Sequence, residues 1–131
     1  MTNVSKIGQI YKCDICGNII EVLHVGGGEL VCCGQPMELL NEKTKENEGR
    51  EKHVPVIKRD EDGTIVNIGS IPHPMEENHY IEWIELENKE KNKTCKKFLT
   101  PKEKPEGKFC AKTDKIKSRA YCNVHGLWKS E

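Results

Sequence analysis

Four cysteines in the first 38 residues limit most strongly how this chain can fold. They form two close pairs, Cys13 with Cys16 and Cys32 with Cys33. A segment of this length cannot bury enough apolar surface to fold by itself, so it needs a cross-link. Four thiolates at these spacings can bind one metal ion in a tetrahedral site. The sequence therefore predicts a metal-stabilised module at residues 1–38.

The spacing within each pair bears on the identity of the metal. Cys13 and Cys16 have the C-x-x-C-G spacing of a metal knuckle, in which Gly17 lets backbone amides turn toward sulfur. Cys32 and Cys33 are adjacent, and neighbouring side chains on an extended backbone point to opposite sides. Binding both to one ion strains the site away from the relaxed geometry of zinc ribbons. The adjacency favours a distorted iron site, and a zinc knuckle is the alternative.

A second group of candidate ligands lies downstream. Cys122 and His125 are three residues apart, so one turn can direct a thiolate and an imidazole to the same point. His53, His73 and His79 stand in unusual local settings, and the two prolines that bracket His73 stiffen its loop. Four imidazoles and one thiolate leave one position open on an octahedral ion. An open position indicates a reaction site rather than a structural one.

Short apolar runs separated by Gly, Pro and Asp predict an antiparallel β-sandwich in residues 51–131. The expected strands are Val54–Ile57, Ile65–Ile68, Tyr80–Glu87, Phe98–Thr100, Phe109–Ala111 and Ile116–Tyr121. Residues 39–50 form the expected linker, because Asn41–Arg50 contains no apolar residue. His24 has no partner at ligand spacing and is expected on an exposed strand.

Composition narrows the class of protein further. No apolar run approaches the roughly 20 residues that cross a bilayer, and the N-terminus lacks the apolar stretch of a signal peptide. An odd count of seven cysteines then favours metal ligation in the cytoplasm over disulfides. Few aromatic residues and no nucleic-acid motif argue against DNA or RNA as a partner. Cys95 and Cys110 lie outside both ligand groups, as two reduced thiols or as a reversible disulfide.

Several motifs in this order resemble a known family. The first module is similar to desulforedoxin, a very small protein with a distorted FeS4 centre. Together with Glu51–Pro55, His73–His79 and Ala120–Trp128, the whole chain resembles desulfoferrodoxin, the two-iron form of superoxide reductase. The resemblance implies an all-β protein with a desulforedoxin-like module and an immunoglobulin-like sandwich. It also implies two irons per chain and a homodimer.

The resemblance assigns roles to individual residues. It implies a ferrous ion bound by four imidazoles in a plane and by Cys122 on the axis, where the thiolate pushes electron density toward the open position. The imidazoles belong to His53, His73, His79 and His125. Glu51 would close the sixth position of the ferric form. Lys52 would attract superoxide and order the water that donates a proton.

The function implied is one-electron reduction of superoxide to hydrogen peroxide without release of dioxygen. A rubredoxin-like carrier is the expected electron donor, and the role of the FeS4 centre in that transfer stays open. Three alternatives are a non-enzymatic iron redox or electron-relay protein, a superoxide dismutase and a zinc-stabilised interaction module. The relay has no use for an open coordination position or for Lys52.

Overall fold

The computed structural model describes residues 3–131 and divides the chain into two compact units, Met1–Asn41 and Glu42–Glu131. In the described part, no helix has the length and apolar character that crossing a membrane requires. The division falls inside the linker predicted at residues 39–50. The exact extent of that linker stays a prediction.

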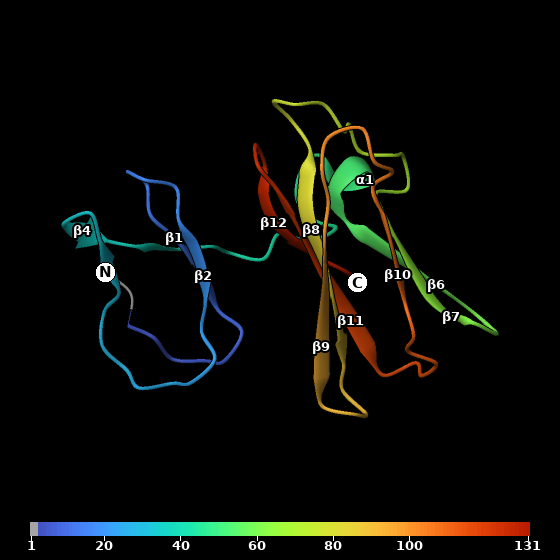
Figure 1. Ribbon diagram of the computed structural model, residues 1–131, viewed down its shortest axis with the longest axis horizontal. Coiled ribbons are helices and arrows are strands. Elements are labelled where there is room, and N and C mark those ends of the chain that lie inside the picture. The colour runs from blue at the N-terminus through green and yellow to red at the C-terminus, as the bar shows by residue number, and fades with distance from the viewer. Residues whose placement is uncertain (1–2) are drawn as a thin grey trace. The chain divides into compact units, whose positions relative to one another are not determined.

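The first unit is built from five very short strands (Figure 1). They are β1 (Ile10–Lys12), β2 (Ile19–Glu21), β3 (Val31–Cys32), β4 (Gln35–Pro36) and β5 (Glu38–Leu39). Three of them form an antiparallel sheet in the order β2-β1-β5, and β3 pairs with β4. The buried hydrophobic cluster consists of Val4, Tyr11, Cys13, Val22 and Met37, and Ile10 is buried as well. One of these few core residues is a candidate ligand, so core and metal site overlap.

The second unit contains seven strands and one helical turn. They are α1 (Arg50–His53), β6 (Pro55–Asp60), β7 (Gly63–Ile68), β8 (Ile81–Asn88), β9 (Lys93–Phe98), β10 (Glu106–Phe109), β11 (Ile116–Cys122) and β12 (Gly126–Lys129). One antiparallel sheet has the order β10-β7-β6, and the other has the order β12-β11-β8-β9 (Figure 1).

The two sheets of the second unit enclose one hydrophobic core. Val66 and Ile68 on β7 pack with Ile84 and Leu86 on β8 and with Ala120 on β11, and all five side chains are buried. A three-stranded sheet of β6, β7 and β10 packed against a four-stranded sheet of β8, β9, β11 and β12 is an immunoglobulin-like sandwich. The predicted all-β class, with a small four-cysteine module and a sandwich, is therefore confirmed.

Three local predictions were wrong. The strand expected at Phe109–Ala111 lies earlier in the chain, as β10 (Glu106–Phe109). The strand expected at Phe98–Thr100 lies earlier, as β9, because this edge strand is rich in exposed lysine and shows no apolar alternation. His24 is exposed as expected, but it lies in a bend after β2 rather than in a strand. The following residues Gly27 and Gly28 both have positive φ, a backbone conformation that does not continue a strand.

Candidate metal centres

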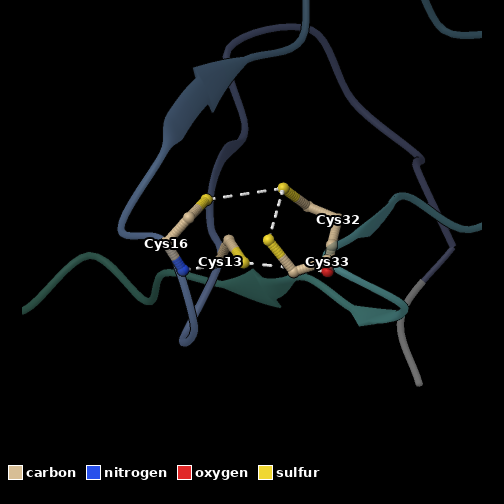
Figure 2. A group of neighbouring side chains, drawn as sticks. All are labelled: Cys13, Cys16, Cys32 and Cys33. Atoms are coloured by element: carbon tan, nitrogen blue, oxygen red, sulfur yellow. Dashed lines mark hydrogen bonds between the residues drawn. The ribbon is translucent and has the colours of Figure 1, made fainter.

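The first unit brings its four cysteine sulfurs into one cluster (Figure 2). All four Sγ atoms lie within 4.8 Å of one another. The Sγ atoms of Cys16 and Cys32 are 3.6 Å apart, and those of Cys32 and Cys33 are 4.0 Å apart. Cys33 and Cys16 are exposed, whereas Cys13 is buried. This S4 set suits a single tetrahedral metal ion.

Backbone geometry explains how these sulfurs converge. The amide of Cys16 donates to the Cys13 Sγ at 3.5 Å, and the amide of Asn18 donates to the Cys16 Sγ at 3.4 Å, as in a metal knuckle. Cys33 has φ of 53°, so the chain leaves the extended conformation between the adjacent pair. A left-handed non-glycine residue costs roughly 1 kcal/mol or more. That turn allows Cys32 and Cys33 to face one ion.

Hydrogen bonds shift the pKa values of two of these thiols in opposite directions. Donation from the Cys16 amide lowers the pKa of the Cys13 thiol to about 6. Sharing of its proton with the neighbouring Cys16 sulfur raises the pKa of Cys32 to about 12. Without a cation, four thiolates repel one another, so the cluster holds some protons. A bound metal ion must displace those protons, which links metal affinity to pH.

The second unit gathers a histidine and cysteine cluster at one end of the sandwich. Ligand atoms of His53, His79, Cys122 and His125 lie within 4.8 Å of one another. His73 lies beside this set, with its Nε2 atom 3.1 Å from the Nε2 atom of His53. The structure thus brings together all five candidates that the sequence placed in three separate segments.

The four imidazoles contact one another in a closed ring. Ring centroids are 4.7 Å apart for His53 and His73, 4.8 Å for His73 and His79, 5.0 Å for His79 and His125, and 4.7 Å for His125 and His53. A closed ring of four neighbours has the connectivity of a square. The Sγ atom of Cys122 lies 3.8 Å from the Nδ1 atom of His125 and supplies a fifth donor.

Hydrogen bonds between histidine rings and backbone carbonyl oxygens identify which ring nitrogen faces the cluster. The Nδ1 atoms of His53 and His73 lie 2.8 Å and 2.6 Å from the carbonyl oxygens of Gly49 and Pro74. A neutral imidazole that donates from Nδ1 keeps a lone pair on Nε2, as metal-bound histidines do. Among the residues that the structure describes, the buried Nε2 atom of His79 has no hydrogen-bond partner. A metal ion would satisfy that orphaned atom.

Burial favours the neutral form of three of the four imidazoles. It lowers the pKa of His73 to about 4, and it lowers the pKa values of His53 and His125 as well. Burial raises the pKa of the Cys122 thiol, and the amide of His125, which donates to Sγ at 3.4 Å, acts in the opposite direction. His53, His73 and Cys122 are buried, whereas His125 is exposed. The cluster is therefore held from one side and open to solvent on the other.

Local structure places each candidate ligand. Cys122 ends β11, and Gly126, with φ of 84°, opens β12, so the hairpin turn between them carries His125. His53 ends α1, the helical turn that the sequence did not predict. A Cβ atom on Gly69 would lie 2.7 Å from the carbonyl oxygen of Glu51. Glycine at this position allows α1 to lie close to the end of β7.

The predicted catalytic residues lie on α1 beside His53. The side chains of Glu51 and Lys52 are both exposed. Within residues 3–131, neither side chain forms an ion pair. Successive side chains of a helix are rotated by about 100°. His53 therefore faces inward, whereas Glu51 and Lys52 face solvent.

Sequence reasoning assigned no role to two residues near this cluster. The Nζ atom of Lys43 donates to the carbonyl oxygen of His125 at 2.9 Å and lies 5.6 Å from the centre of the Trp128 ring. Trp128 stacks on His53 with centroids 4.7 Å apart. The polar composition around Lys43 indicated only a linker.

Cys95 and Cys110 are exposed and free, and a reversible disulfide between them stays a prediction.

Two protein-family models match this chain, and each of them covers one of the two clusters. The family model described as desulfoferrodoxin matches residues 44–131, and the model of the desulfoferrodoxin N-terminal domain matches residues 5–40. A desulfoferrodoxin of Nitratidesulfovibrio vulgaris is 56% identical over 123 residues, which is 94% of this chain and 95% of that one.

Solved structures of superoxide reductases share the fold. The protein from Treponema pallidum has a TM-score of 0.71 at 23% identity and covers 100% of both chains. The protein from Giardia intestinalis has a TM-score of 0.51 at 34% identity, over 61% of this chain and 95% of that one. The two ligand clusters are consistent with the two iron centres of desulfoferrodoxin. This chain belongs to the desulfoferrodoxin family.

Proposed function

We propose that this protein is a superoxide reductase whose reaction takes place in the second unit. The reaction adds one electron and two protons to superoxide and yields hydrogen peroxide. The observation that carries the proposal is the closed ring of four imidazoles with a thiolate beside it. Five donors leave one position open on an octahedral ion. The likeness to superoxide reductases supports this reading.

The nine proposed ligands divide between two irons. Cys13, Cys16, Cys32 and Cys33 hold the first, and His53, His73, His79, Cys122 and His125 hold the second. In the second site the donors are Nε2 of three histidines, Nδ1 of His125 and Sγ of Cys122. Iron bound there supplies the electron and a positive charge that attracts an anion.

The protein matrix prepares this site before the substrate arrives. Carbonyl oxygens of Gly49 and Pro74 accept the Nδ1 protons of His53 and His73 and fix both rings. Neutral imidazoles leave the site positively charged, which favours the anion superoxide. The amide of His125 stabilises the thiolate form of Cys122. Exposure of His125 gives a small substrate access from solvent.

Glu51 and Lys52 are the proposed catalytic residues. In this proposal the ammonium of Lys52 draws superoxide toward the cluster and holds the water that delivers a proton. The carboxylate of Glu51 would close the sixth position of the ferric form. Both roles are supported by the position of these residues on the helical turn that ends at His53.

Other expectations from the resemblance remain predictions. We expect a small rubredoxin-like electron carrier as donor, a homodimer and a cytoplasmic location. The free state of all seven cysteines fits a reducing compartment. Whether the first iron passes electrons to the second is a separate question from the reaction itself.

Stoichiometry of one turnover tests the proposed reaction against its alternatives. The reduced protein is mixed with superoxide under anaerobic conditions, and the amounts of hydrogen peroxide and dioxygen formed are measured. A reductase yields one peroxide for each superoxide and no dioxygen. A dismutase yields one peroxide and one dioxygen for every two superoxide ions. An electron-relay protein with no reactive site leaves superoxide to decay at its uncatalysed rate.

A further inference from the structure

The side chain of Asn123 bridges two segments that carry candidate ligands. Asn123 lies in the turn between Cys122 and His125. Its Oδ1 atom accepts the amide of Tyr80 at 2.9 Å, and its Nδ2 atom donates to the carbonyl oxygen of Asn78 at 3.0 Å. These two backbone groups flank His79. The backbone amide of Asn123 also donates to the carbonyl oxygen of Tyr80 at 3.3 Å.

His79 differs from the two buried histidines in how its ring is held. The rings of His53 and His73 are each fixed by a hydrogen bond from Nδ1 to a carbonyl oxygen. Within residues 3–131, no such bond is found for the His79 ring, and its buried Nε2 atom lacks a partner. The position of His79 therefore depends on its backbone. Its own segment provides only reciprocal backbone bonds with Glu76, at 3.0 Å and 3.1 Å.

We propose that Asn123 is a positioning residue that fixes His79 relative to Cys122 and His125. This inference rests on the proposed ligand set and deepens it. The amide side chain binds the peptide groups on both sides of His79, so the histidine cannot move independently of the hairpin turn. Loss of partners that orient a metal ligand typically weakens metal binding about 10-fold to 100-fold.

Cobalt(II) uptake by the full chain tests this role. The measurements use the Cys13→Ser background, in which only the histidine and cysteine cluster retains its complete ligand set. Asn123→Ala should raise the dissociation constant for cobalt at least about 10-fold. Asn123→Asp keeps the acceptor for Tyr80 but loses the donor to Asn78, so it should show a smaller increase. Asn78→Ala is the matched control, because its contact with Asn123 uses only the main-chain carbonyl.

A second readout separates positioning from general stability. Cobalt(II) shifts the proton NMR signals of bound imidazoles, so the signals of His79 should move in the Asn123 variants while those of His73 stay in place. If Asn123→Ala does not fold, Asn123→Asp decides the question by the same signals. Equal affinity and unchanged His79 signals in all variants would overturn the role of Asn123. Failure of the parent background to bind cobalt would overturn the proposed ligand set itself.

Discussion

The two units hold their ligand clusters in opposite ways. In the first unit, the buried core consists of a few residues, and Cys13 is one of them. In the second unit, two sheets enclose a core of their own, and among the five proposed ligands only Cys122 belongs to it. The first cluster therefore stabilises its unit, whereas the second is carried by a unit that is already stable. This difference teaches that a site can keep a coordination position open when the fold does not depend on filling it.

The largest expected effect comes from breaking the first cluster. Cys13→Ser removes a ligand and a core side chain together, so the first unit should lose its folded structure. The second unit has its own core, and its rate constant with superoxide should stay within about twofold of the parent. NMR spectra report the first unit, and stopped-flow absorbance reports the reaction. A lost reaction in this variant would show that the two units depend on each other.

Metal removal should separate the two units without any mutation. A strong chelator in reducing buffer should unfold residues of the first unit, because a site built from four thiolates is formed only in the folded, metal-bound state. Strands β6 to β12 should keep their slow amide hydrogen exchange. Protection that disappears from both units at the same rate would contradict the comparison. Zinc added back should restore the first unit.

Acid should destabilise the metal-free second unit. Burial lowers the pKa of His73 to about 4 in the folded state, and the unfolded value is about 6.5. As the pH falls between these values, the unfolded chain takes up the proton first, so stability present above pH 6.5 is lost toward pH 4. The loss from His73 is on the order of 3 kcal/mol. Urea unfolding at several pH values should show it.

A histidine variant makes that pH test specific. His73→Asn should flatten the pH dependence of the free energy of unfolding, whereas His24→Asn, at an exposed position of the first unit, should leave it unchanged. The pKa values of His53 and His125 are also lowered by burial, so part of the slope should persist in the first variant. An unchanged slope would show that His73 titrates normally.

The next effect concerns attraction of the substrate. The chain has a formal net charge of zero, so a local cation must guide superoxide. Lys52→Ala should slow the second-order reaction by about tenfold, or about 1.4 kcal/mol. Added salt should slow the parent more than the variant. Lys58→Ala, another exposed lysine, is the control, and equal rates and salt slopes for parent and Lys52→Ala would remove Lys52 from the mechanism.

Lys43 should give the smallest effect. Its ammonium binds the carbonyl oxygen of His125, so Lys43→Met removes one positive charge near the cluster. Because solvent screens such charges, the rate constant with superoxide should fall only about threefold. Lys43→Arg should keep the parent rate, and Lys45→Met, two residues along the same segment, should have no effect. An equal fall of the rate constant in Lys45→Met would show that the effect comes from the overall charge of the protein and not from the position of Lys43.

The sequence predicted the ligand clusters better than their surroundings. Cysteine and histidine residues at metal-ligand spacing usually indicate metal binding, so both clusters could be predicted from the sequence. Contacts such as Asn123 with the backbone around His79 join segments that are distant in sequence and use an ordinary polar residue. Lys43 gave no signal for the same reason. Its role appears only once the hairpin turn at His125 lies beside it.

The fold was predictable to a similar degree. Strands with buried β-branched residues, such as β7 and β8, show their period in the sequence. The edge strand β9 does not, because all of its residues except Lys96 are exposed and no buried face alternates with a solvent-facing one. Helix α1 has four residues, which is too short for a helical period to be seen. Tertiary contacts with Gly69 and Ile71 hold it in place instead.

Iron content per chain tests the central claim most directly. The account requires two irons in the parent, one in Cys13→Ser and one in Cys122→Ala, because the two ligand sets share no residue. Elemental analysis of the three purified proteins gives these numbers without reference to activity. Two irons in the parent and one in each variant is the predicted result. Zinc in place of iron in the parent, or loss of both irons in either variant, would contradict the account.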